Sequence, residues 1–100
     1  MRFGLKEEVI QAICNVFENH PEVEKALLYG SRAKGNYKPA SDIDLTLMGD
    51  GIDLSSLNKI SWELDDLLLP YTFDLSIYHY LNDSDLLDHI HRVGITFYSK

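Results

Sequence analysis

The sequence predicts a single α/β (α+β) domain over residues 1–100, in which a small mixed sheet of three to four strands has helices packed on one face. Two observations predict this class. Apolar residues recur at helical spacing in three segments, and short apolar or alternating runs lie between them. The composition, 45% hydrophobic and 25% charged, is ordinary for one soluble globular core.

The first half of the chain is predicted to form a helix, a strand, a loop and a second strand. Apolar spacing predicts a helix over 5–17, which His20-Pro21 ends. The apolar run 26–29 stops at a glycine and is typical of a buried strand. Turn-forming residues mark a loop over 35–41, and the alternation over 42–48 predicts the second strand.

The second half is predicted to form a helix, a strand, a helix and a short edge strand. Leucine and isoleucine recur over 54–68, and a proline ends that helix. The β-rich composition of 72–80 predicts a third strand. A last helix is expected over 83–93, capped by Gly94, with an edge strand over 95–98.

Charge and hydropathy exclude two classes of function. The net charge of −7 argues against a protein that holds duplex nucleic acid through broad phosphate contacts. No apolar run approaches the roughly 20 residues that a membrane span needs. The N-terminus lacks a signal-peptide core, and the single cysteine cannot form an internal disulfide, so we expect a cytoplasmic protein.

Two aspartates flank one residue at the start of the second predicted strand. Side chains alternate between the faces of a strand, so Asp42 and Asp44 point the same way. Like charges so close cost free energy unless a cation lies between them. On the third strand, Asp74 falls on the matching face. Alone it would be a solvent-facing residue, but three carboxylates suit Mg²⁺ or Mn²⁺ rather than zinc.

The turn before the loop offers a second kind of site. Gly30 lets the backbone turn sharply, and Ser31 supplies a hydroxyl and an amide that could meet phosphate. Such a pair is usually only a turn, so it is informative only beside the aspartates. Arg32 and Lys34 could also reach phosphate, although solvated loop charges explain them equally well.

Together these motifs resemble the minimal nucleotidyltransferases of the DNA polymerase β-like superfamily. The resemblance lies in Gly30-Ser31-Arg32-Ala33-Lys34-Gly35, then Ser41-Asp42-Ile43-Asp44-Leu45, and then Asp74. It implies a polymerase β palm-like fold in which the three aspartates bind two Mg²⁺ ions, and Asp74 helps to activate an attacking hydroxyl. It also implies that Gly30 and Ser31 hold the β- and γ-phosphates of a nucleoside triphosphate, from which a nucleoside monophosphate, AMP from ATP, is transferred.

The resemblance extends to a partner. Chains this short often act with a small helical protein of the HEPN class, as the antitoxin of a toxin–antitoxin pair, and adenylylate one of its tyrosines. A homo- or hetero-oligomer is therefore expected. An aromatic surface of Tyr78, Tyr80, Trp62 and Tyr71 could hold the partner, or could be ordinary packing.

Two alternatives stay open for the function. The same chemistry could act on a small molecule, as in the aminoglycoside-modifying relatives. The chain could instead neutralise a partner by binding alone, although the intact Asp42, Asp44 and Asp74 favour chemistry.

Overall fold

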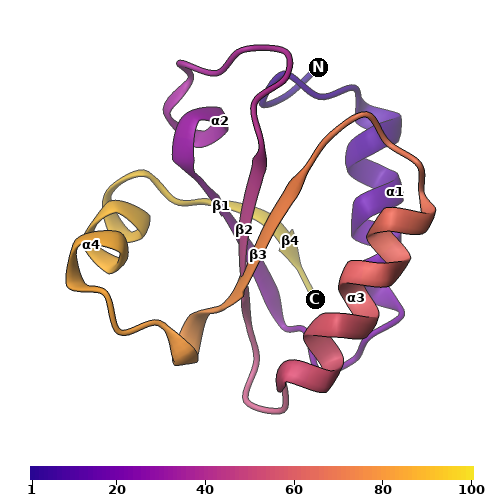
Figure 1. Ribbon diagram of the computed structural model, residues 1–100, viewed down its shortest axis with the longest axis vertical. Helices are drawn as coiled ribbons and strands as arrows, with labels where there is room; N and C mark the ends of the chain where they lie inside the picture. The colour runs from indigo at the N-terminus through magenta and orange to yellow at the C-terminus, as the bar shows by residue number, and fades with distance from the viewer.

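Four strands form one mixed sheet at the centre of the computed structural model, which describes residues 1–100 (Figure 1). The strands are β1 (Lys25–Tyr29), β2 (Ile43–Met48), β3 (Phe73–Ile77) and β4 (Ile95–Ser99). Their order across the sheet is β3-β2-β1-β4. β1 is antiparallel to β2 and β4, whereas β2 and β3 are parallel. The predicted α/β class and mixed sheet are thereby confirmed.

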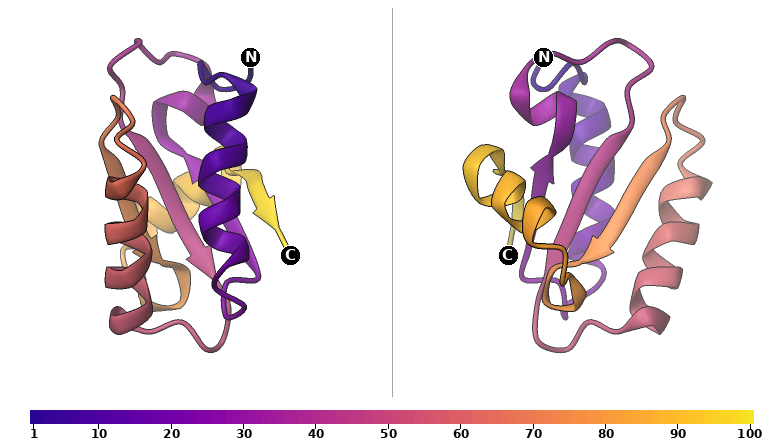
Figure 2. Two further views of the ribbon diagram at one scale, coloured as in Figure 1. Left: turned by 90° about the vertical axis from the view of Figure 1, so that its right-hand side faces the viewer. Right: turned by 60° about the vertical axis from the view of Figure 1, so that its left-hand side comes forward.

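Helices α1 (Glu7–Glu18) and α3 (Leu54–Asp66) cover one face of this sheet (Figures 1 and 2). The core between them is made by Leu28 of β1, by the odd-numbered residues of β2 and by the apolar sides of both helices. The N-terminus of α3 is capped by Asp53, whose carboxylate accepts a hydrogen bond of 2.9 Å from the Ser56 amide. None of the helices is both long and apolar enough to cross a bilayer.

Helix α4 (Ser84–Val93) lies on the other side of the sheet, so the helices do not all share one face as the sequence analysis expected (Figure 2). The His89 ring of α4 meets the Tyr29 ring edge-on, with centroids 6.1 Å apart. Tyr29 is adjacent to Leu28 in β1, so their side chains point to opposite faces. The face that carries the polar residues of the strands is therefore partly covered by α4.

Two predicted strands are shorter in the structure. β2 begins at Ile43, which leaves Asp42 just before the strand. β3 ends at Ile77, the last residue that pairs with β2, and Tyr78–Tyr80 form a 3₁₀ turn, η1, closed by a bond from the Leu81 amide to the Tyr78 carbonyl. Tyr78 and Tyr80 therefore do not continue the alternation that places Asp74.

The expected aromatic surface is not formed. Trp62 is 69% exposed on α3, on the core side of the sheet, whereas Tyr78 contacts His91 of α4 on the other side. Tyr71 packs on the guanidinium of Arg32 instead, with 5.1 Å between the group and the ring centroid. The four aromatic residues are carried by a helix, a turn and a loop, so Trp62, Tyr71 and Tyr78 face different neighbours.

Candidate functional site

One row of side chains crosses the polar face of the sheet and contains two of the predicted aspartates. The strand register pairs Tyr29 with Asp44, and Asp44 with Asp74. Paired residues on neighbouring strands project from the same face at a separation of about 5 Å. Asp44 and Asp74 are therefore neighbours, on the face that the alternation predicted for both. Asp42 is exposed and stands two residues before Asp44.

The carboxyl group of Asp44 is the electrostatic centre of this row. Its pKa is raised from 3.8 to about 6, chiefly by burial, and then by the charges of Asp74 and Asp42. The guanidinium of Arg32 opposes this shift and lowers the same pKa by a smaller amount. The negative charge of Asp44 is thus less favourable here than in water, and a cation at this point would stabilise it.

The donor set suits a divalent metal, since all three groups offer carboxylate oxygens and no histidine or cysteine joins them. The side chains do not form a preassembled cluster of three ligands. Repulsion between like charges favours such an open arrangement, and a divalent cation would remove that repulsion. Asp42, Asp44 and Asp74 are therefore able to act as metal ligands by their chemistry, and that role stays a prediction.

Gly30 brings the predicted phosphate-binding turn directly against Asp44. Its φ of +73° lies in the left-handed region, which glycine adopts without strain. A Cβ added at Gly30 would overlap the Oδ2 atom of Asp44. Any other residue here would need both a rare backbone conformation and a displacement of the Asp44 carboxylate. Gly30 also begins the short helix α2 (Gly30–Lys34), in which Ser31 is partly buried.

Arg32 is not a loop charge that reaches into solvent, and here the structure corrects the sequence analysis. Its side chain is 2% exposed. The guanidinium donates hydrogen bonds to the carbonyls of Phe3, Pro39 and Ser41, at 2.8 to 3.2 Å. Arg32 therefore ties the loop that leads to the aspartates onto the N-terminal segment. With its donors used in this way, it positions the site rather than binding phosphate.

Lys34 keeps the environment that the sequence predicts for it. It is exposed in the last turn of α2, and Gly35 ends that helix with a φ of +90°. Lys34 can therefore meet a polyanion from solvent, which Arg32 cannot do without leaving its three carbonyls.

Sequence reasoning missed further polar groups on the same face of the sheet as the aspartates. The hydroxyls of Thr46 and Ser76, which pair across β2 and β3, are buried without a hydrogen-bond partner. Ser76 lies near the phenol of Tyr29, whose pKa is raised chiefly by burial; the nearby Ser76 hydroxyl opposes this shift, and the charges of Asp74 and Asp44 add smaller increases. Alternation within β1 places Tyr29 on the face opposite to the core residue Leu28, but its pairing with Asp44 is seen only in the structure.

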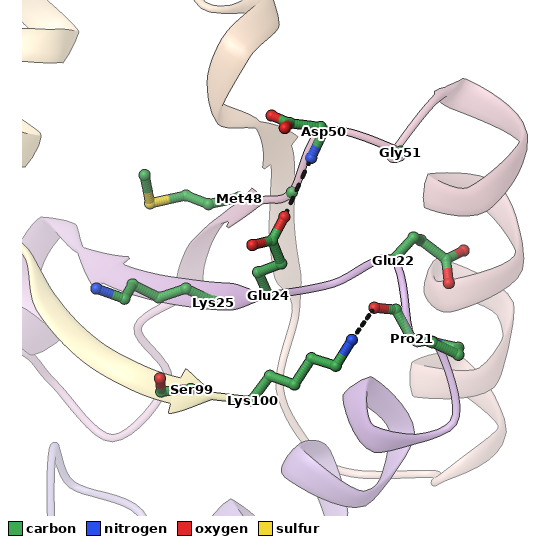
Figure 3. Close-up of a pocket in the computed structure, with 10 residues that line it drawn as sticks. Pro21, Glu22, Glu24, Lys25, Met48, Asp50, Gly51, Ser99 and Lys100 are labelled. Carbon is green, nitrogen blue, oxygen red and sulfur yellow. Dashed lines mark hydrogen bonds between the residues drawn. The ribbon is translucent and has the colours of Figure 1, made fainter.

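A groove of about 640 Å³ lies at the opposite end of the sheet (Figure 3). Its lining includes Met48, the last residue of β2, and Asp50 of the turn that follows. Across it, the Lys100 side chain donates a 3.0 Å hydrogen bond to the Pro21 carbonyl. Since Asp44 lies near the other end of β2, the groove is separate from the three aspartates.

Comparisons with known proteins identify the family and the fold of the chain. Residues 11–100 match the family model described as polymerase beta, nucleotidyltransferase. No protein with curated information matches the chain.

Several solved structures share the fold. One is a toxin–antitoxin complex with AMP-PNP, at 21% identity and a TM-score of 0.71, over 96% of this chain and 75% of that chain. Another is a tri-AMPylated HEPN toxin with an MNT antitoxin from Shewanella oneidensis, at 16% identity, a TM-score of 0.69, and 96% and 74% coverage. A third is the MntA–HepT toxin–antitoxin, at 15% identity, a TM-score of 0.68, and 95% and 74% coverage. Because the family model matches nearly the whole sequence and the fold agrees, the chain belongs to the polymerase β nucleotidyltransferase family.

Proposed function

We propose that this chain transfers AMP from ATP to a hydroxyl group, with release of pyrophosphate. The observation that carries the proposal is the contact of two predicted elements, because the Gly30 turn lies directly against Asp44. Asp44 is in turn the register partner of Asp74. A triphosphate held at the turn would therefore extend toward the carboxylates. Family membership and the AMP-PNP present in one similar structure support a nucleoside triphosphate as the donor.

In this reaction each residue has a separate task. Gly30 and Ser31 would bind the β- and γ-phosphates, and Lys34 would approach them from solvent. Asp42 and Asp44 would hold Mg²⁺ (two ions, with Mn²⁺ as an alternative), and Asp74 would complete that site. Bound there, the metal would supply charge stabilisation for an in-line displacement at phosphorus.

The proposed transfer forms one bond at the α-phosphorus, breaks another, and releases one proton. The acceptor hydroxyl oxygen forms a bond to the α-phosphorus, and the bond from that phosphorus to the bridging oxygen of pyrophosphate breaks. The hydroxyl proton leaves toward a carboxylate, for which Asp74 is the candidate. Asp74 is the exposed carboxylate of its strand pair, whereas Asp44 is partly buried, so Asp74 is better placed to meet an incoming acceptor.

For the acceptor we propose a tyrosine of a helical HEPN-type partner, in the cytoplasm, with this chain as the antitoxin of the pair. The support is the fold that it shares with proteins from toxin–antitoxin complexes, one of which holds a tri-AMPylated HEPN toxin. The exposed position of Asp42 and Asp74 also leaves room for a large acceptor.

The test is transfer of label to the partner. The chain is incubated with ATP labelled at the α-phosphate, with Mg²⁺ and with the HEPN-type protein encoded beside it. Label should appear on a partner tyrosine with the wild type and with Asp50→Ala, an exposed aspartate at the far end of the sheet, but not with Asp42→Ala. ATP labelled at the γ-phosphate should give no labelled partner.

The other outcomes separate the alternatives. Partner binding that survives Asp42→Ala, with no label under any condition, would identify an antitoxin that acts by binding alone. Label on an aminoglycoside rather than on the partner would identify a small-molecule acceptor. The proposal of nucleotidyl transfer is wrong if none of these acceptors is labelled.

A further inference from the structure

A histidine of α4 contacts the glycine of the proposed phosphate-binding turn. The Gly30 amide donates a hydrogen bond of 3.0 Å to the Nε2 atom of His89. The same ring lies edge-on to Tyr29, at an interplanar angle of 82°. The two residues are 59 positions apart in the sequence, and the His89 side chain is partly buried. A bond between parts of the chain so far apart depends on tertiary structure alone.

The direction of this bond defines the state of the ring. A nitrogen that accepts a hydrogen bond carries no proton, so His89 is neutral here, with its proton on Nδ1. Gly30 lies in the left-handed region, which glycine adopts without strain, and it follows directly after β1. The bond to His89 therefore restrains the peptide plane that leads from β1 into the turn.

Gly30 is held from two sides. Its Cα side faces the Asp44 carboxylate so closely that a Cβ would overlap it, and its N–H faces His89. A rotation of this peptide would change the direction of the next amide and of the Ser31 side chain. The Ser31 amide and the Ser31 hydroxyl are the groups that would bind the triphosphate.

We propose that His89 is a positioning residue for nucleotide binding, which holds the Gly30–Ser31 turn in the shape that receives the triphosphate. The inference rests on the proposed function, since it assumes that this turn binds the nucleotide. His89 acts through the Gly30 amide and touches no reacting atom. Packing alone would be the ordinary role of a partly buried histidine, and the experiment has to separate the two roles.

The variants exploit the length of two amide side chains. In His89→Gln the carbonyl oxygen can occupy the position of Nε2, whereas in His89→Asn the same group is too short to reach the Gly30 amide. His89→Phe keeps a ring against Tyr29 without an acceptor, which provides a second test if the Asn variant does not fold. His91→Asn, on the exposed side of the same helix, is the matched control.

The expected result is a change in KM for ATP with little change in kcat. His89→Asn and His89→Phe should raise KM about threefold to tenfold, the range for one lost hydrogen bond. His89→Gln and His91→Asn should stay within about twofold of the wild type. This pattern distinguishes positioning from packing, because Gln restores the acceptor without restoring the ring.

The Gly30 amide resonance in a ¹⁵N–¹H spectrum of the nucleotide-free chain gives a readout that needs no activity. It should move upfield in His89→Asn and His89→Phe and stay near its wild-type position in His89→Gln. If the resonance moves but KM does not, the bond is made but does not position the nucleotide, and the proposal is overturned while nucleotidyl transfer stands. If the resonance does not move, the bond is not made in solution, and the proposal is overturned as well. If the wild type itself binds no nucleotide, the proposed function fails, and the role of His89 fails with it.

Discussion

Replacing Asp44 by asparagine should stabilise the metal-free protein although it abolishes nucleotidyl transfer. Asp44 is partly buried and lies beside Asp74 and Asp42, so its charge is disfavoured in the folded chain. Asparagine has almost the same shape and carries no charge. The substitution removes the repulsion and leaves the contact with Gly30 in place. A carboxylate that lowers the stability of the free fold is expected at a site where a bound cation supplies the compensating charge.

The size of the effect follows from the pKa of Asp44. It is about 6 in the folded chain, against a reference value of 3.8. At about 1.4 kcal/mol per pKa unit, this difference sets an upper limit of about 3 kcal/mol. Partial exposure of the carboxyl group to solvent reduces it to about 1–2 kcal/mol. A domain of this length gains about 4–8 °C in Tm per kcal/mol, so the rise should be readily measured.

The dependence on pH has a definite sign. Because the folded-state pKa lies above the unfolded one, the native chain binds a proton more readily between about pH 3.8 and pH 6. The contribution of Asp44 to the free energy of unfolding therefore falls as pH rises through this window, and it is constant above it. Asp44→Asn removes this contribution, so its advantage over the wild type should be full at pH 8 and nearly absent at pH 4.

Thermal unfolding followed by circular dichroism in EDTA, at pH 8 and at pH 4, measures both values. Asp50→Asn is the control, since Asp50 is exposed and lies far from the row. Added Mg²⁺ should then raise the Tm of the wild type but not that of Asp44→Asn. An Asp44→Asn variant no more stable than the wild type at pH 8 would falsify the view that the three carboxylates repel one another in the free protein.

Two further predictions concern the backbone around the site, and urea denaturation checks both. Gly30→Ala should lower the free energy of unfolding by about 2–4 kcal/mol, because the new Cβ would be strained by the positive φ and would overlap Asp44. Gly35 also has a positive φ but has open space around it, so Gly35→Ala should lower the free energy of unfolding by only about 1 kcal/mol. Equal costs would mean that the contact with Asp44 is not made. Arg32→Lys should lower the free energy of unfolding by about 2–4 kcal/mol, because an ammonium group cannot donate to all three carbonyls. Lys34 is exposed, so Lys34→Ala should change the free energy of unfolding by no more than about 0.5 kcal/mol. If Arg32→Lys leaves the free energy of unfolding unchanged, the hydrogen bonds from Arg32 do not stabilise the fold, and its structural role is wrong.

The faces of the strands could be predicted from the sequence because their period is fixed by covalent geometry. Alternation places Asp44 and Asp74 on the side away from the core residues Leu45 and Leu75, whatever the order of the strands. Whether those two aspartates become neighbours depends on the pairing of β2 with β3, which no local pattern specifies. The parallel register Asp44 with Asp74 is therefore information that only the structure provides.

The position of α4 could not be predicted for a related reason. Its apolar residues show that one side of the helix is buried, but they do not say against which face of the sheet. The choice is decided by the connection from β3. That strand ends at Ile77, and the turn η1 then leads the chain to the polar face, where Ile90 becomes buried. For the same reason, nothing nearby in sequence marks His89 as a neighbour of Gly30.

Arg32 shows where charge counting fails. A run of basic residues without acidic ones predicts a positive loop, and the prediction holds for Lys34 and Lys38, which are exposed. Arg32 stands in the same run but points inward from α2. Its partners are backbone carbonyls, among them those of Phe3 and Pro39, and every residue has such a carbonyl, so no sequence signal marks them.

The ten residues between Ser31 and Asp42 have a physical explanation in this fold. They contain most of α2 and the loop that reverses the chain, so that β2 returns antiparallel to β1 with Asp44 beside Tyr29. The reversal places the carboxylate against Gly30, the residue after Tyr29, and Arg32 ties the loop down through Ser41. The motif is therefore one structural unit, in which the spacing itself brings the turn and the carboxylates together.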